Sequence, residues 1–339
     1  MKTSTDRQRT LEMACISQLA YVAYKQGNDI VSDILKTGTP SFFPAYQTIE
    51  FISAPRPLSD TDELVCCGLL LSTENDIVIA IRGTERLDDY FFNLLAFPNS
   101  EAIHSGFNLY VKSFWQQLQD FIQRQENANK NIFVTGHSLG GAAATLITKR
   151  ISETELKPIA PYTLETYTFG APPVSTIELI LDTPIYRFRN IGDFIPNLPK
   201  IIAVLLNKIP GIKQLILNWK PELLQTLTDY SHVGNEYCIN KNFQVLEQNE
   251  PNLPNIKLIL QISSLLAAQL KSPSQAGVNK FRLLINTLIQ TSLEEHRAIK
   301  YVERISFGKL PAYISNLHDD EEKKREEDNN AVIIPPQNL

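Results

Sequence analysis

The chain has few cysteines for its length, only four among 339 residues, at positions 15, 66, 67 and 238. Small secreted domains that depend on disulfides carry many more. Cys66 and Cys67 are neighbours and would point to opposite faces of a strand. We therefore expect four reduced, mostly buried thiols. The paired Cys and His spacings of zinc sites are also missing, so no metal ligand set is predicted.

Long apolar runs and an excess of basic charge are missing as well. Apolar stretches such as residues 201–206 are far too short to span a bilayer. The net charge of −5 gives no reason to expect nucleic acid as a partner. Charged residues persist from the start of the chain to Glu12, so no signal peptide is predicted. The expected location is the cytoplasm, with a peripheral membrane position as the second option.

Helix-like and strand-like segments alternate along the chain, and 43% of the residues are hydrophobic. This composition provides a substantial core for a chain of this size. The alternation predicts an α/β fold with a mainly parallel central sheet flanked by helices. The expected helices cover residues 11–26, 107–124 and 140–150, and the expected strands cover 64–71, 77–81, 132–135, 163–169 and 185–189.

One short motif stands between a strand-like and a helix-like segment. Residues 131–144 read NIFVTGHSLGGAAA and place Ser138 between Gly136 and Gly140. The pattern G-x-S-x-G is typical of a nucleophile elbow, a sharp strand-to-helix turn with a strained serine at its apex. Glycines remove the Cβ atoms that would clash in so tight a turn. We expect the serine oxygen to be exposed above the sheet, where the helix N-terminus favours negative charge.

A nucleophilic serine needs a base, and the base needs an orienting acid. After an elbow of this kind, the acid and then the histidine follow along the chain. Asp193 fits the acid, because it lies in the loop that leaves the carboxyl end of the strand at 185–189, whereas Asp182 precedes that strand. Position along the chain leaves two candidate bases, His232 and His296.

Several segments together resemble the class 3 lipase family, the fungal-type triacylglycerol lipases of the α/β-hydrolase superfamily. They cover about residues 10–305 and read, in order, VIAIRGT, IHSGF, VTGHSLGGAAATL, TFGAPPV, YRFRNIGDFIPNLP, YSHVGNEYCI and EHRAIKYV. In that family the base comes late and shortly before a tyrosine. The resemblance therefore favours His296, which precedes Tyr301, and leaves His232 as the alternative.

The resemblance implies a serine hydrolase that cleaves carboxylic ester bonds of lipids through an acyl-enzyme on Ser138, without a cofactor. The elbow itself predicts the backbone N–H of Leu139 as one oxyanion donor. The resemblance adds Thr84 as the other donor and suggests a lid around residues 89–94, where DYFFNL departs from the family's D-W-x-x-D-L. The alternatives are a small-ester carboxylesterase and a lipase-like scaffold without turnover that binds a partner.

We expect one domain over residues 1–317, with helical inserts at about 199–229 and 250–293 and a charged, disordered tail at 318–339. The first insert combines an apolar helical face with interleaved lysines. Packing of this face on the core is favoured, and docking on a membrane or lipid-droplet surface is the alternative.

Overall fold

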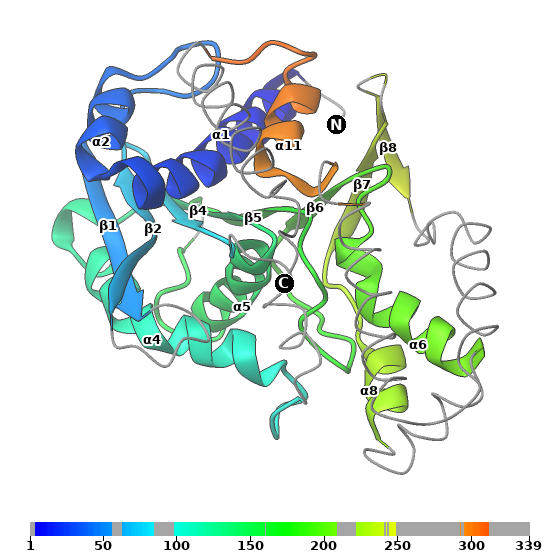
Figure 1. Cartoon of the computed structure of the whole chain (residues 1–339). Helices are drawn as coiled ribbons and strands as arrows, with labels where there is room; N and C mark the ends of the chain where they lie inside the picture. Colours follow the sequence, from blue (N-terminus) through cyan, green and yellow to red (C-terminus); the bar gives the residue numbers. More distant parts are fainter. Residues whose placement is uncertain are drawn as a thin grey trace, which may run out of the picture.

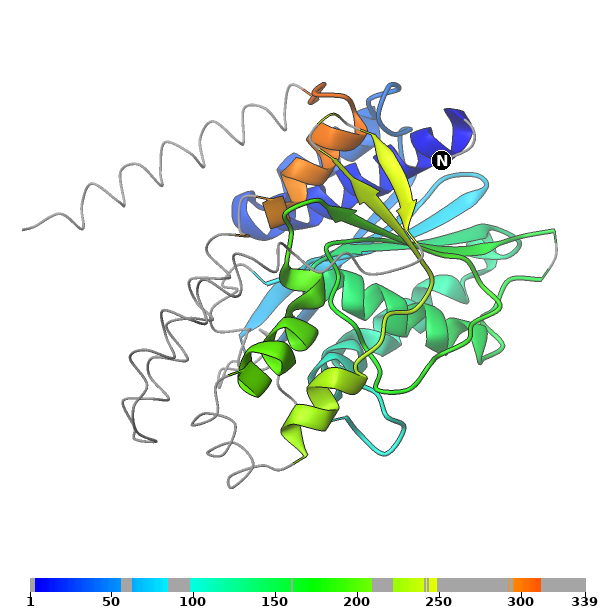
Figure 2. The same cartoon turned by 90° about the vertical axis from the view of Figure 1, so that its right-hand side faces the viewer.

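The computed structural model describes residues 4–55, 63–84, 98–159, 161–208, 222–240, 242, 244–248, 292 and 295–311. These residues form one central sheet with helices on both faces (Figure 1; Figure 2). The predicted α/β class is therefore confirmed. The tail at 318–339, most of the insert at 250–293 and the stretch at 89–94 lie outside the described residues.

The sheet has eight strands that lie in their order along the chain. The five strands from β3 to β7 are parallel to one another, whereas β1–β2, β2–β3 and β7–β8 pair in antiparallel fashion. The expected mainly parallel sheet is thus correct, although β1, β7 and β8 are not among the strands expected from the pattern along the chain. The strands are β1 Thr48–Pro55, β2 Leu64–Ser72, β3 Asp76–Ile81, β4 Asn131–His137, β5 Leu164–Phe169, β6 Ile185–Asn190, β7 Asn235–Ile239 and β8 Val245–Gln248.

Helices cover the two faces of the sheet unequally. One face carries α4 Ser105–Ile122, α5 Leu139–Ser152, α6 Leu198–Lys208 and α8 Leu223–Asp229; the other carries α1 Ser4–Gln26, α2 Asn28–Thr37 and α11 Ala298–Ile305. Two short 3-10 helices, η1 Gln125–Asn127 and η2 Ile195–Asn197, complete the set of described elements. Figure 1 shows α1 beside α11, so the two ends of the described chain meet on one face.

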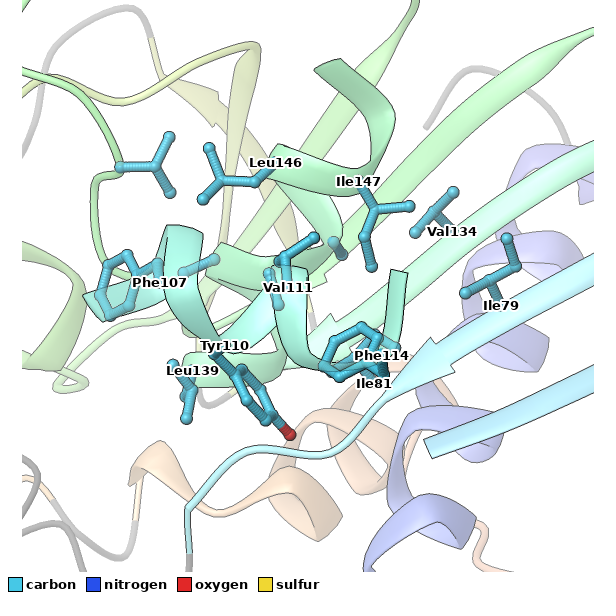
Figure 3. Close-up of a cluster of buried hydrophobic side chains, with 14 of the residues drawn as sticks. Ile79, Ile81, Phe107, Tyr110, Val111, Phe114, Val134, Leu139, Leu146 and Ile147 are labelled. Atoms are coloured by element: carbon cyan, nitrogen blue, oxygen red, sulfur yellow. The ribbon is translucent and has the colours of Figure 1, made fainter. Parts of the chain in front are cut away.

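The central strands are apolar on both sides, as expected for parallel strands buried between helices. In β4, Ile132 and Val134 face the α4–α5 layer, and Phe133 faces the α1 layer. Figure 3 shows the first of these layers, in which side chains from α4 and α5 meet those of β3 and β4. The fully buried run 142–144, all alanine, allows α5 to lie close to the sheet directly after Ser138.

Parts of the first insert belong to the core. Leu198, Ile201 and Ile202 of α6 are buried against the α4–α5 side of the sheet, so this helix packs as the favoured interpretation expected. Residues 209–221, which carry most of the proposed lipid-facing side chains, lie outside the described residues. Within the described ranges, none of the helices has the length and apolar character that a membrane crossing requires.

None of the four cysteines forms a disulfide bond, in agreement with the prediction of reduced thiols. Cys15, Cys67 and Cys238 are buried, and Cys66 is half-buried. Burial raises the pKa of all four thiols, most of all for Cys15, and it raises the pKa of Cys238 to about 11. No group of three or more His, Cys, Asp or Glu side chains in the described part of the chain is arranged to hold a metal ion.

Candidate active site

The turn between β4 and α5 has the strained geometry of a nucleophile elbow. Ser138 has φ 57° and ψ −124°, a conformation that non-glycine residues rarely adopt. A Cβ on Gly136 would lie 2.3 Å from the carbonyl of Gly140, and a Cβ on Gly140 would lie 2.0 Å from the carbonyl oxygen of Ile81. Both glycines are therefore required by the packing of the turn, as the motif indicates.

The expectation of an exposed serine oxygen is wrong. The side chain of Ser138 has no accessible surface, and its Oγ is fully buried. The cause is close packing around the elbow: a Cβ on Gly83 would lie 3.2 Å from the Cβ of Ser138, so the segment after β3 lies directly against it. A substrate reaches this hydroxyl only if the residues that cover it move.

Asp193 and His296 form a buried pair. Nδ1 of His296 lies 2.8 Å from Oδ2 of Asp193, and neither side chain has more than 2% of its surface exposed. The other carboxylate oxygen accepts from the backbone N–H of Ile195 at 3.0 Å and from the hydroxyl of Ser292 at 3.4 Å. These contacts hold the carboxylate in one orientation and direct the imidazole of His296 with it.

The alternative base, His232, is engaged elsewhere. It precedes β7, and its Nε2 lies 3.1 Å from the carbonyl oxygen of Pro196. Burial, together with the positive charges of Arg187 and Lys200, lowers the pKa of His232 well below its ordinary value. In the structure it is thus His296, and not His232, that is paired with Asp193.

Ser138 and His296 both border the carboxyl end of β5. The backbone N–H of Ser138 donates to the carbonyl of Phe169 at 2.9 Å. The next residue, Gly170, has φ +62°, and a Cβ there would lie 2.9 Å from Nδ1 and Cε1 of His296. Ser138 Oγ and His296 Nε2 make no hydrogen bond to each other or to another described residue. Catalytic hydrogen bonds are often long before substrate binds.

The two predicted oxyanion donors flank the serine. Leu139 is the first residue of α5, so its backbone N–H has no acceptor within the helix. Thr84 follows Gly83, which lies against Ser138, and the Thr84 Oγ1 is buried without a hydrogen bond among the described residues. Leu139 therefore lies at the positive end of a helix dipole beside Ser138, and Thr84 directly follows the residue that packs against Ser138.

Residues 78–203 match the model of the family described as lipase (class 3). Over these residues the chain is similar to the class 3 lipase family. Thr84, Ser138 and Asp193 lie inside this range, whereas His296 and all of α1 lie outside it. The match thus covers the candidate nucleophile, the candidate acid and the candidate oxyanion segment, and it does not extend to the candidate base.

The chain is also similar to individual proteins that are named lipases. The chain is 32% identical over 148 residues to Lipase ZK262.3 of Caenorhabditis elegans, which covers 40% of this chain and 41% of the relative. It is 28% identical over 177 residues to Triacylglycerol lipase OBL1 of Arabidopsis thaliana, with 37% and 34% covered. The chain therefore spans less than half the length of these relatives.

The solved structure of lipase II from Rhizopus niveus shares the fold. The superposition has a TM-score of 0.50 at 20% identity, and the aligned region covers 70% of this chain and 82% of the Rhizopus niveus chain. At this identity the likeness establishes the fold alone, which is the α/β-hydrolase fold predicted from the sequence.

Two tyrosines at the site were not assigned a role from the sequence. Tyr301 was used only as a marker for the histidine before it, yet its hydroxyl donates to Oδ2 of Asp193 at 2.5 Å. Tyr21 lies in α1, and its hydroxyl lies 2.9 Å from Nδ1 of His137. For Tyr301, its spacing from His296 could have indicated a role at the site. For Tyr21, the sequence contains no such signal.

Proposed function

We propose that this protein hydrolyses carboxylic esters of lipids through an acyl-enzyme on Ser138. The observation that carries the proposal is that three polar atoms on segments bordering the elbow are buried without a hydrogen bond to any described residue: Thr84 Oγ1, Ser138 Oγ and His296 Nε2. Buried polar atoms are normally paired, and each unpaired one costs about 1–3 kcal/mol. A reacting group that binds there during turnover accounts for all three.

The first half-reaction forms the acyl-enzyme. Because the Asp193 carboxylate accepts a hydrogen bond, Nδ1 of His296 carries a proton and Nε2 has a free lone pair. Nε2 takes the hydroxyl proton of Ser138 as Oγ bonds to the acyl carbon of the ester. The resulting oxyanion accepts hydrogen bonds from the backbone N–H of Leu139 and from Thr84. Collapse breaks the bond to the alcohol, which leaves with the proton from His296.

The second half-reaction releases the acid. Water gives a proton to Nε2 of His296, and its oxygen bonds to the acyl carbon. A second oxyanion forms at the same donors, and collapse returns the proton to Oγ of Ser138 and frees the carboxylic acid. Throughout, Asp193 holds the imidazole in place and stabilises its charged form. These steps use only side chains of this chain and water.

Lipid esters are the proposed substrate class, with acylglycerols first, because the relatives are named lipases and one is named a triacylglycerol lipase. The burial of Ser138 is consistent with a site that opens only when substrate is present. A water-insoluble substrate brings the enzyme to a membrane or lipid-droplet surface, so peripheral contact with such a surface is part of the proposal. Sedimentation with anionic vesicles checks it; absence of binding by active enzyme would exclude this part.

The deciding experiment measures fatty acid released from emulsified tri- and diacylglycerol, galactolipid and phospholipid, beside short- and long-chain p-nitrophenyl esters. A fluorophosphonate probe reports the nucleophile in parallel. We expect turnover of at least one lipid and labelling of the protein. Both are lost in Ser138→Ala, since removing a serine nucleophile lowers kcat about 10⁶-fold.

Each other outcome has a meaning. Cleavage of short esters alone identifies a small-ester carboxylesterase. If the folded protein is not labelled by the probe and releases no fatty acid from the emulsion, the proposal is overturned and a binding scaffold remains. The paired Asp193 and His296 argue against that scaffold, because a protein without turnover has no need of an oriented imidazole beside a strained serine.

A further inference from the structure

His137, the residue before the nucleophile, connects two segments that are far away in the sequence. Its Nδ1 lies 2.9 Å from the hydroxyl of Tyr21 in α1. Its Nε2 makes a short hydrogen bond to the backbone carbonyl oxygen of His296. The ring is buried, and its centroid lies 4.7 Å from that of the His296 ring.

The partners determine the protonation of His137. A carbonyl oxygen only accepts, so Nε2 of His137 carries a proton and donates a hydrogen bond to the backbone carbonyl of His296. Nδ1 is then unprotonated and accepts from the hydroxyl of Tyr21. Burial and the neighbouring imidazole of His296 lower the pKa of His137 well below its ordinary value, which keeps the ring neutral. Both nitrogens are thus committed to hydrogen bonds, and neither is left for the reaction.

The hydroxyl of Tyr21 also lies against the oxyanion segment. A Cβ on Gly83 would lie 2.3 Å from this hydroxyl and 2.6 Å from the carbonyl oxygen of His137. Gly83 directly precedes Thr84. The Tyr21 hydroxyl therefore contacts both the segment after β3 and the elbow. The His137 ring connects this hydroxyl to the backbone of His296.

The carbonyl before His296 is anchored in a similar way. The side-chain amide of Asn190, at the end of β6, donates to the carbonyl of Glu295 at 2.8 Å. Two consecutive carbonyls in front of α11 are therefore fixed by side chains at the ends of β4 and β6. Asp193 sets the direction of the imidazole, whereas these bonds set the position of its backbone and hence of Nε2.

We propose that Tyr21 and His137 form a clamp that positions His296 and the Gly83–Thr84 segment around Ser138. The proposal rests on the proposed ester hydrolysis. It makes α1, which lies outside the family match, part of the working site. The two residues are positioning residues, because neither has a free group to offer the substrate. A displacement of about 1 Å at a reacting group is enough to lower the rate about 100-fold.

The test compares three variants at the clamp. Tyr21→Phe removes one hydroxyl, and His137→Leu removes both hydrogen bonds. His137→Gln retains an amide N–H that reaches the carbonyl of His296. We expect kcat and the rate of fluorophosphonate labelling to fall about 10- to 100-fold in Tyr21→Phe and further in His137→Leu. KM stays within about threefold, and His137→Gln recovers part of the loss relative to His137→Leu.

Tyr46→Phe is the matched control. Its hydroxyl also makes a buried hydrogen bond between distant segments, from the loop before β1 to Glu12 of α1 at 2.6 Å, but it lies near Asp76 at the opposite end of β3. A merely structural loss therefore appears in both tyrosine variants as a lower melting temperature. Only a loss of positioning lowers kcat and the labelling rate in Tyr21→Phe and leaves both unchanged in Tyr46→Phe.

Two further results separate failure of the clamp from failure of the proposed function. An active wild type with an equally active Tyr21→Phe variant overturns the clamp and leaves the function intact. A wild type without turnover overturns the function. In that case the ring ¹⁵N chemical shifts of His137 and His296 decide on the clamp: if they do not change in Tyr21→Phe, the clamp is wrong.

Discussion

The hydroxyl of Tyr301 donates to Oδ2 of Asp193, the same oxygen that accepts from Nδ1 of His296. Neither Tyr301 nor Asp193 has any exposed surface. Burial, together with the charge of Asp193, raises the pKa of Tyr301 well above its ordinary value, so the hydroxyl remains a donor. The acid of the proposed triad is therefore held by a residue of α11 as well as by its own loop.

Replacing Tyr301 with Phe removes this donor and keeps the ring. Because hydrogen bonds to charged groups contribute about 1.5–3 kcal/mol, we expect the free energy of unfolding to fall by about that amount. We expect kcat/KM to fall about 10-fold, since a less restrained carboxylate orients His296 less well. Urea denaturation and steady-state kinetics measure the two effects.

Tyr167→Phe serves as the control, because its hydroxyl also donates to a carboxylate, Glu165, at 2.8 Å but away from the pair. It should leave kcat/KM unchanged. A Tyr301→Phe variant within twofold of wild-type kcat/KM would show that the loop alone holds Asp193.

Replacing Thr84 with Val separates its role in turnover from its role in stability. The hydroxyl is buried without a partner among the described residues, so removing it does not lower the free energy of unfolding. If it donates to the oxyanion, kcat falls about 100-fold with little change in KM. Thr84→Ser, which keeps the hydroxyl, should retain most of the activity. Equal kcat in Val and Ser variants would limit the role of Thr84 to its backbone N–H.

His232 should affect acid stability and not catalysis. Its folded-state pKa is depressed, so below the unfolded value of about 6.5 the unfolded chain binds more protons. The stability that depends on neutral His232 is thus present above pH 6.5 and lost as the pH falls. In His232→Gln, the loss of unfolding free energy between pH 6 and pH 5 should be smaller by about 1.4 kcal/mol.

The same variant decides between the two candidate bases. Activity should remain within a few-fold of wild type in His232→Gln and disappear in His296→Gln. The reverse pattern would make the pairing of His296 with Asp193 purely structural. Unfolding curves at pH 7, 6 and 5 and one kinetic assay are sufficient.

The tight turn at Gly140 predicts a large cost for a single methyl group. A Cβ there meets the carbonyl of Ile81 at 2.0 Å, which only a backbone shift relieves. We expect Gly140→Ala to lose about 3 kcal/mol or more of stability, or to fail to fold. Gly106→Ala, where the nearest atom is a ring carbon at 3.3 Å, should change stability by about 1 kcal/mol at most. Similar melting temperatures for the two variants would contradict the packing of the elbow.

The sequence predicted the central part of the fold well, because the pattern there is local. Strands β3 to β6 are short apolar runs between helix-like segments. A nearly continuous apolar run is typical of a parallel strand that is buried on both faces. Strand β1 was missed because its residues are mixed in polarity and several are only half-buried. An edge strand of this kind is stabilised by its pairing with β2, which a pattern along one segment does not contain.

The amino-acid sequence by itself was enough to predict the candidate nucleophile, because the elbow needs only five adjacent residues and its glycines are required by the turn itself. Which histidine meets Asp193, and how the serine is covered, was decided only by the tertiary structure. His296 is 103 residues from Asp193, and Tyr21 is 116 residues from His137. Such contacts form because the sheet brings the ends of its strands and the helices α1 and α11 together. The hydrophobic periodicity of each segment carries no information about these contacts.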